Sequence, residues 1–320
     1  MDGRQETTQV AAERLGREPD NLDHGTLSVM TIIKLPDGRD LDLDVSGPEY
    51  GMPLVYHHGT AGSVHQLRVM QRAAHDCGLR LATYSRPGYG ASTRQPGRSV
   101  VDAASDVAAL LAHLGVPRCL VAGWSGGGPH ALATGARLPE QVAGILCIAG
   151  VAPYDAEGLD FLDGMRPQNI DAWRLAVKGE EAMRPGLEVY AAKVSESDAA
   201  DLIAEWVTSL PDIDRAVLTA EFGEDMVANE AEAFRLGADG FIDDNLAFVK
   251  PWGFSLAEIA VPTFVWQGSE DTNVPFAHGQ WLAAHVPGAT VRLKQGEGHL
   301  SIGVGALDRM FDDLITASFD

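Results

Sequence analysis

The segment around Ser125 limits the possible folds of this chain more than any other part of the sequence. An apolar stretch, Cys119–Ala122, leads into Gly123-Trp124-Ser125-Gly126-Gly127, and helical signals follow. This order predicts a buried strand, a sharp turn and a helix. At the tightest turns of this kind, the residues two before and two after the apex lie close together and must be small. Gly123 and Gly127 meet that requirement.

Such a turn makes Ser125 a candidate nucleophile. It lifts the hydroxyl clear of the sheet, and the backbone N–H of the following residue stays free to bind an oxyanion near a helix N-terminus. The alternative is a glycine-rich turn that binds phosphate. The glycines here do not have the G-x-G-x-x-G spacing, and no Walker lysine follows them, so we favour the nucleophile.

A serine hydroxyl needs a base to accept its proton, and the base needs a partner that fixes its tautomer. His299 lies in a glycine-flanked segment after the predicted strand Ala289–Leu293, and Asp271 follows the predicted strand Val261–Trp266. Because the carboxyl ends of parallel strands share one edge of a sheet, both side chains are expected near the serine. We predict His299 as general base and Asp271 as its orienting acid, with Glu270 as the alternative acid.

Strand and helix signals alternate along most of the chain. The predicted strands are almost entirely apolar, which indicates a parallel sheet covered on both faces. Thr26–Leu35 and Arg39–Val45 form a predicted hairpin, and from about residue 152 to 250 the signals are mainly helical. We therefore predict an α/β fold with a mostly parallel central sheet flanked by helices. The predicted parts are a polar N-terminal extension (1–25), a core (26–151 and 251–320) and a helical cap insertion (152–250).

The charge and cysteine content disfavour several classes of protein. A formal net charge of −21 argues against nucleic acid or an anionic membrane as partner. No stretch approaches the roughly 18 apolar residues of a membrane span, and no secretory signal is visible. The three cysteines, Cys77, Cys119 and Cys147, are odd in number and lack paired spacing, which argues against disulfides or a zinc site. We expect a cytoplasmic protein that acts on a small molecule.

Four segments in order resemble the α/β-hydrolase superfamily, in particular its capped, esterase-like serine hydrolases, from about Leu27 to the C-terminus. They are the elbow at Ser125, the Asp271/His299 pair, His57-His58-Gly59-Thr60 and Ser85-Arg86-Pro87-Gly88-Tyr89-Gly90-Ala91-Ser92. The last segment usually opens with Asp in this family and here opens with Ser85. The chain order Ser, Asp, His is also that of the family.

The resemblance assigns roles to further residues. It implies an oxyanion hole formed by the backbone N–H groups of Thr60 and Gly126, with His58 shaping the loop through hydrogen bonds. Trp124 either lines the substrate pocket or has an ordinary packing role. No metal ion and no organic cofactor are required by this chemistry.

The implied reaction is hydrolysis of an ester, thioester, lactone or related carbonyl substrate through an acyl-enzyme. Serine at the elbow disfavours the epoxide-hydrolase and haloalkane-dehalogenase branches, which use Asp there. A C–C bond hydrolase, a perhydrolase and an aminopeptidase-like hydrolase stay open. So do a cofactor-free dioxygenase and a ligand-binding receptor. The oligomeric state is also open.

The predicted cap is expected to cover Ser125 and to supply an apolar wall to the substrate pocket. It contains many large apolar side chains, namely Phe161, Met165, Trp173, Met183, Tyr190, Trp206, Phe222, Met226 and Phe234. Ligand pockets are mostly apolar, which supports this role. The competing hypothesis is that acidic residues of the cap bind a cationic group, although a solvated acidic surface is the simpler explanation of the charge.

Overall fold

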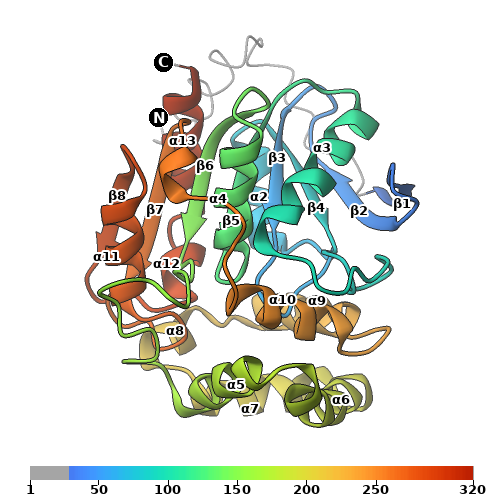
Figure 1. Cartoon of the computed structure of the whole chain (residues 1–320), viewed down its shortest axis with the longest axis vertical. Coiled ribbons are helices and arrows are strands. Elements are labelled where there is room, and N and C mark those ends of the chain that lie inside the picture. Colours follow the sequence, from blue (N-terminus) through green and yellow to red (C-terminus); the bar gives the residue numbers. More distant parts are fainter. Residues whose placement is uncertain (1–28, 320) are drawn as a thin grey trace.

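The computed structural model describes residues 29–319 and contains an eight-stranded sheet (Figure 1). In chain order the strands are β1 (Val29–Lys34), β2 (Asp40–Ser46), β3 (Met52–His57), β4 (Leu79–Tyr84), β5 (Cys119–Trp124), β6 (Val142–Ile148), β7 (Thr263–Gly268) and β8 (Thr290–Lys294). Their order across the sheet is β1-β2-β4-β3-β5-β6-β7-β8. Strand β2 runs antiparallel to both of its neighbours, and every other pairing is parallel. The prediction of a mostly parallel sheet is confirmed.

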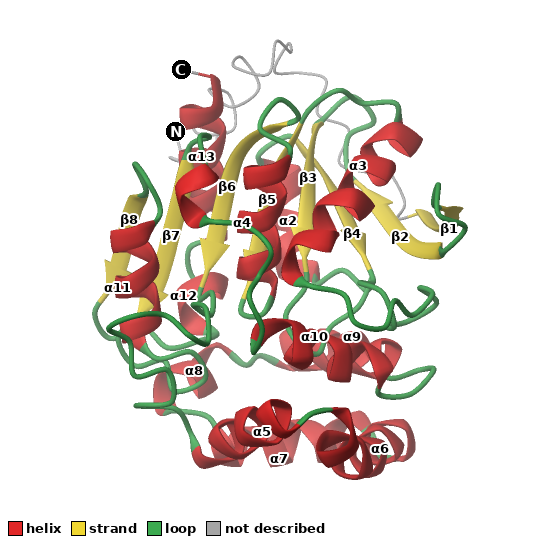
Figure 2. Ribbon diagram, viewed as in Figure 1, coloured by secondary structure: helices red, strands yellow, loops and turns green. Residues whose placement is uncertain are grey.

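Helices cover both faces of the sheet (Figure 2). They are α2 (Arg68–Asp76), η2 (Val100–Asp102), α3 (Ala103–Leu114), α4 (Gly127–Arg137), η3 (Leu256–Glu258), α11 (Phe276–His285), α12 (Ser301–Val304) and α13 (Leu307–Phe319). In β5, Val121 packs in the cluster that contains side chains of α3, α4 and α11. Its neighbours Leu120 and Ala122 pack in the cluster that contains side chains of α2, α12 and α13. Burial on both faces explains why this strand is apolar throughout.

The predicted hairpin is present within the described residues. Lys34 pairs with Asp40 next to the turn, and Gly38 has a φ of +90°, a conformation that glycine adopts without strain. The polar extension predicted for residues 1–25 lies outside the described residues.

Six consecutive α-helices follow β6 and precede η3 and β7, and we call residues 167–248 the inserted helices. They are α5 (Pro167–Lys178), α6 (Glu180–Glu196), α7 (Ala199–Ser209), α8 (Asp212–Val217), α9 (Ala220–Ala233) and α10 (Asp239–Phe248). They lie beyond the carboxyl edge of the parallel strands, with α9 and α10 next to the sheet and α5–α7 farther out (Figure 1). A separate small core joins them, with Val194, Leu202 and Ile242 among its members.

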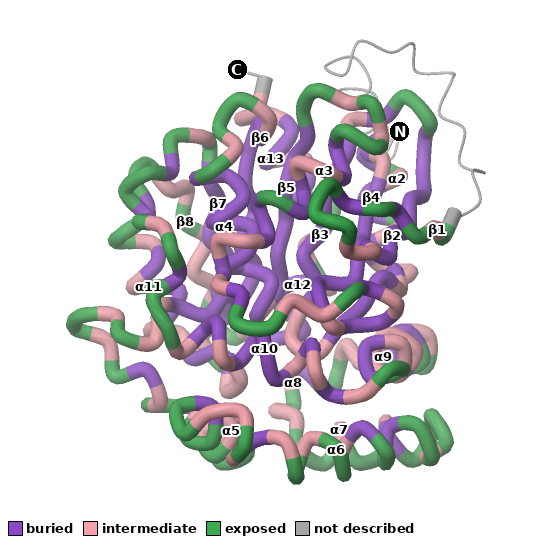
Figure 3. Tube along the Cα trace, turned by 45° about the vertical axis from the view of Figure 1, so that its right-hand side comes forward, coloured by how far each residue is buried: buried purple, intermediate pink, exposed green. Residues whose placement is uncertain are grey.

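Burial falls from the sheet toward the outer inserted helices (Figure 3). The sheet strands are mostly buried, whereas α5, α6 and α7 alternate between buried and exposed positions. Among the described residues, no helix has both the length and the apolar character needed to cross a membrane.

Candidate functional site

The turn after β5 holds Ser125 in a left-handed backbone conformation with a φ of +57°. Few residues other than glycine adopt this conformation, and it is often found at functional sites. The glycines on either side are sterically required. A Cβ on Gly123 would lie 2.1 Å from the carbonyl oxygen of Gly127, and one on Gly127 would lie 2.0 Å from that of His57. The tight turn predicted from the sequence is therefore present.

The loops after β7 and β8 bring Asp271 and His299 into contact. His299 Nδ1 lies 2.7 Å from Asp271 Oδ2, and both side chains are buried. Glu270 instead accepts a hydrogen bond from the hydroxyl of the neighbouring Ser269 at 3.2 Å. Of the two candidate acids, the structure brings Asp271 to the histidine.

Three further donors fix the orientation of the Asp271 carboxylate. Its Oδ1 accepts hydrogen bonds from the backbone N–H groups of Asn273 and Val274, each at 2.8 Å. Its Oδ2 accepts a bond from Gln267 Nε2 at 2.9 Å in addition to the contact with His299. The carboxylate that orients the histidine is thus itself held by the start of the following turn.

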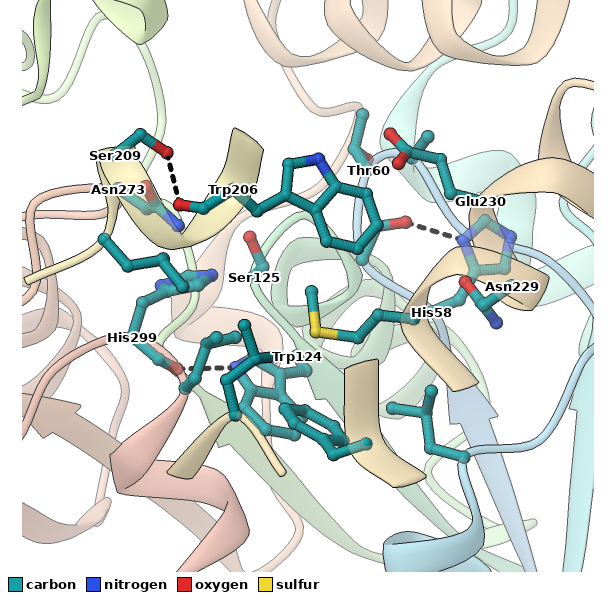
Figure 4. Close-up of a pocket in the computed structure, with 18 of the residues that line it drawn as sticks. His58, Thr60, Trp124, Ser125, Trp206, Ser209, Asn229, Glu230, Asn273 and His299 are labelled. Carbon is teal, nitrogen blue, oxygen red and sulfur yellow. Dashed lines mark hydrogen bonds between the residues drawn. The ribbon is translucent and has the colours of Figure 1, made fainter. Parts of the chain in front are cut away.

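Ser125 and His299 both line one cavity of about 310 Å³ (Figure 4). Within the part of the chain that the structure describes, no hydrogen bond joins the Ser125 hydroxyl to His299. Such contacts are often long in free enzymes and tighten when substrate binds. No group of three or more His, Cys, Asp or Glu side chains suited to a metal ion occurs among residues 29–319.

The two predicted oxyanion residues are neighbours. A Cβ on Gly126 would lie 2.4 Å from the Thr60 hydroxyl oxygen, and Thr60 lines the cavity together with Ser125. His58 shapes this loop as predicted. Its Nδ1–H donates to the Gly59 carbonyl at 2.7 Å, and its Nε2 accepts from the Arg86 backbone N–H at 3.0 Å. Burial lowers the pKa of His58 well below its usual value, which keeps the ring neutral as this pattern requires.

A buried ion cluster supports the loop that carries Thr60. Asp244, in α10, lies 2.6 Å from Arg86 Nη2 and 2.7 Å from Arg98 Nη2, and it accepts a hydrogen bond from the Thr60 hydroxyl at 2.8 Å. Burial opposes ionisation of Asp244, but Arg86 and Arg98 hold its pKa well below the usual range. Arg86 also donates to the carbonyls of His58 and Gly59. The cluster therefore ties the inserted helices to the loop after β3.

A second buried carboxylate of the inserted helices binds the backbone around His299. Asp214, in α8, accepts hydrogen bonds from the N–H groups of His299 and Leu300 at 2.9 Å and of Ser301 at 3.0 Å. A Cβ on Gly298 would lie 2.4 Å from Asp214 Oδ1, so the carboxylate fits closely against this loop. Asp214 thus fixes the position of the His299 backbone, whereas Asp271 fixes its ring.

Trp124 combines the two roles considered for it. Its side chain lines the cavity, and its indole N–H donates to the His299 carbonyl at 3.1 Å. A Cβ on Gly303 would lie 2.2 Å from the indole ring, so the ring also packs closely against α12.

Apolar and polar side chains share the cavity wall, and ten of its 22 members come from the inserted helices. Its apolar members are Tyr56, Ala61, Leu67, Trp124, Tyr190, Trp206, Leu210, Leu218, Phe222, Met226 and Leu300. Its other members include Arg166, Asn169, Ser209, Asn229, Glu230 and Asn273. Burial raises the pKa of Glu230 to about 7, and Tyr190 donates a hydrogen bond to it at 2.9 Å. The cavity therefore presents apolar and polar surface in similar measure.

Sequence reasoning missed Asp214, Asp244, Arg166 and Glu230. Each lies among many acidic or basic residues of one helical segment, and no local motif distinguishes it. Arg86 belongs to the segment 85–92 that resembles the family, but its contact with Asp244, 158 positions away, could not be predicted from that segment.

The sequence model described as alpha/beta hydrolase fold matches residues 52–306, and the chain belongs to this family. An uncharacterised hydrolase of Bacillus subtilis strain 168, YcgS, is 24% identical over 278 residues, which cover 82% of this chain and 89% of that protein. A non-heme chloroperoxidase of Streptomyces lividans is 28% identical over 155 residues, 48% of this chain and 56% of that protein.

Solved structures show the same fold. A thermophilic esterase from Thermogutta terrifontis superposes with a TM-score of 0.64 at 18% identity, covering 91% of this chain and all of that one. A bromoperoxidase from Bacillus anthracis gives a TM-score of 0.64 at 22% identity, with 91% and 99% covered.

Proposed function

We propose that this protein is a serine hydrolase that cleaves an ester, thioester, lactone or related carbonyl substrate. One observation carries the proposal. Ser125, whose backbone is in the left-handed conformation, and His299, whose ring contacts the Asp271 carboxylate, line the same cavity. A metal or cofactor is not needed to activate the serine in such an arrangement. The family assignment supports hydrolysis as the reaction class.

In the proposed reaction, Ser125 Oγ attacks the substrate carbonyl carbon while His299 Nε2 accepts the hydroxyl proton. The backbone N–H groups of Thr60 and Gly126 bind the resulting oxyanion. As the bond to the leaving group breaks, His299 passes its proton to that group, and an acyl-enzyme remains on Ser125. Water then attacks the acyl carbon, His299 takes a proton from it and returns one to Ser125, and the acid is released.

The inserted helices act in this proposal as a cap over the reacting groups. Large side chains of α7 and α9, among them Trp206, Phe222 and Met226, line the cavity that contains Ser125. The apolar part of the wall that these side chains form favours a hydrophobic acyl or alcohol part of the substrate.

A fluorophosphonate probe tests the nucleophile directly. We expect covalent labelling of Ser125, identified by peptide mass spectrometry, and burst kinetics with a 4-nitrophenyl ester. Ser125→Ala should abolish labelling and lower kcat by roughly 10⁴- to 10⁶-fold. The matched control is Ser195→Ala, because Ser195 is exposed on α6 and should leave both readouts unchanged. Labelling at another residue, or ester hydrolysis that survives in Ser125→Ala, would refute the proposal.

Perhydrolysis is a second candidate reaction, and the chloroperoxidase and bromoperoxidase among the similar proteins favour it. The same acyl-enzyme would transfer its acyl group to hydrogen peroxide in place of water, giving a peracid. Peracid formation from acetate and peroxide, measured in wild type and Ser125→Ala, tests this reaction. Equal rates in the two proteins would exclude it.

A further inference from the structure

The polar members of the cavity lie on two sides of the serine. Ser209 and Asn273 lie on one side of Ser125 in Figure 4, and Asn229 and Glu230 lie on the other. Arg166 belongs with the first group, because its Nη1 donates to the Ser209 hydroxyl at 3.4 Å. The two ends of the cavity therefore differ in charge.

Arg166 is the single arginine or lysine that lines the cavity in the described part of the chain. Its Nε donates to Asn169 Oδ1 at 3.1 Å, and its backbone N–H donates to the Thr272 carbonyl at 2.9 Å. These bonds hold the residue beside the loop that carries Asp271. Among residues 29–319, no carboxylate lies within ion-pair distance of its guanidinium, unlike Arg86, Arg94 or Arg98.

The negative charge of Asp271 acts on this guanidinium from beyond ion-pair distance. A guanidinium with no carboxylate in direct contact is suited to bind an anion, since a planar donor fork matches a carboxylate or phosphate. Its surroundings strengthen this preference. Burial lowers the pKa of Arg166, which reports partial loss of hydration, although the group stays charged. A partly desolvated cation binds an anion more strongly than one in bulk water.

The opposite end of the cavity is a poor cation site by comparison. Glu230 already accepts a hydrogen bond from Tyr190, and burial raises its pKa to about 7, so near neutral pH much of it is uncharged. The cavity thus offers a permanent positive charge at Arg166 and only a partial negative charge at Glu230.

We propose that Arg166, with Asn169 and Ser209 around it, binds a carboxylate on the substrate, so that the preferred substrates are anionic esters. This inference rests on the proposed ester hydrolysis and adds the charge of the substrate. It is opposed to the hypothesis that acidic residues of the predicted cap bind a cationic group of the substrate.

Matched ester pairs measure the preference. Monoethyl adipate is compared with ethyl heptanoate, which places the charge on the acyl side, and 4-acetoxybutanoate with pentyl acetate, which places it on the alcohol side. Ethyl 6-aminohexanoate supplies the cationic analogue. Hydrolysis of each ester is followed by pH-stat titration, and kcat/KM is determined for wild type and variants.

In the wild type, kcat/KM should be about 10- to 100-fold higher for the anionic than for the neutral ester in at least one pair, as expected for a charged hydrogen bond. Arg166→Gln should reduce this ratio to about one, and Arg166→Lys should keep part of it because lysine retains the charge but not the fork. Arg174→Gln is the control, since Arg174 lies exposed on α5, the helix that begins directly after Arg166, and it should leave the ratio unchanged.

Parallel loss of activity on both members of a pair in Arg166→Gln would overturn the inference and assign Arg166 a purely structural role. A wild type that prefers the neutral or cationic ester would also overturn it. If Arg166→Gln fails to fold, Arg166→Lys and competitive inhibition of the wild type by adipate, with hexane-1,6-diol as neutral control, decide the same point. If Ser125 is labelled and neutral esters are hydrolysed but anionic esters are not preferred, this inference fails while the proposed function stands. If Ser125 is not labelled and no ester is hydrolysed, the proposed function itself fails.

Discussion

Replacement of Asp214 by asparagine tests whether the inserted helices fix the catalytic geometry. The carboxylate accepts three backbone hydrogen bonds, one at Oδ2 from His299 and two at Oδ1 from Leu300 and Ser301. An asparagine of the same shape has one acceptor oxygen. If that oxygen keeps the two bonds at the Oδ1 position, its NH₂ group faces the N–H of His299, and two donors oppose each other.

The expected magnitude follows from this geometry. One buried backbone N–H without an acceptor costs about 1–3 kcal/mol, so the free energy of unfolding should fall by that amount. Movement of His299 away from the opposed NH₂ group should also lower kcat. Displacement of a reacting group by about 1 Å can reduce a rate roughly 10²-fold, and we expect a decrease of about 10- to 100-fold with a smaller change in KM.

The assays are urea denaturation, ester kinetics and the rate of fluorophosphonate labelling, which reports the reactivity of Ser125 without substrate binding. Asp212→Asn is the matched control, because Asp212 lies in the same helix with its side chain 96% exposed. It should leave stability and kcat within experimental error. Wild-type stability and wild-type labelling rate in Asp214→Asn would show that the His299 loop does not depend on this carboxylate.

Three further predictions follow from the site. Asp271→Asn should preserve the fold at a cost of about 1–3 kcal/mol, because its NH₂ group would face the Gln267 amide donor, and it should lower kcat by about 10⁴-fold, whereas Glu270→Gln should have little effect; the reverse ranking in ester assays would move the acid to Glu270. Gly127→Ala should reduce kcat and unfolding free energy, the latter by at least about 1–3 kcal/mol, because its Cβ would lie 2.0 Å from a carbonyl oxygen of β3. Gly186→Ala is the control, because a Cβ at this position on α6 would meet no atom within 4 Å, and it should change neither kcat nor unfolding free energy by a similar amount. Similar losses in the two variants would refute the steric argument. Burial raises the pKa of Glu230 from 4.5 to about 7, so the folded protein retains a proton that the unfolded chain loses, and stability should fall as pH rises through that interval. Denaturation curves at pH 5 and pH 8 measure this decrease in unfolding free energy, and Glu230→Gln should make it about 1–3 kcal/mol smaller. An identical pH dependence in wild type and variant would contradict the raised pKa of Glu230.

The sheet and the elbow could be predicted from the sequence because their signals are local. A strand buried on both faces is apolar throughout, and Gly123 is required by a contact with the Gly127 carbonyl inside the turn itself. The contact that requires Gly127 is with His57 of β3, but the turn pattern around Ser125 already indicates a small residue there. His299 and Asp271 were predictable for a related reason, since each follows a strand whose carboxyl end is fixed by the parallel sheet.

The buried charges could not be predicted in the same way. Asp214 binds a loop 85 to 87 positions later, and Asp244 meets Arg86 across 158 positions. An acidic residue in an acidic helical segment is usually solvated, and only tertiary packing distinguishes the few that are buried. Arg166 could not be predicted either. Whether an arginine is paired with a carboxylate or lines a cavity without one depends on the folded chain and not on its sequence neighbours.

The positions of Asp214 and Asp244 divide the inserted helices into two parts that should tolerate change differently. Both carboxylates lie within α8–α10, where they bind the His299 loop and the Thr60 loop. Helices α5–α7 lie farther from the sheet and contribute Asn169, Tyr190 and Trp206 to the cavity wall. Exchange of residues 167–209 between related proteins should therefore alter substrate selectivity while Ser125 and His299 keep their positions. Exchange of α8–α10 would instead remove the buried hydrogen bonds and ion pairs that hold the loops of His299 and Thr60.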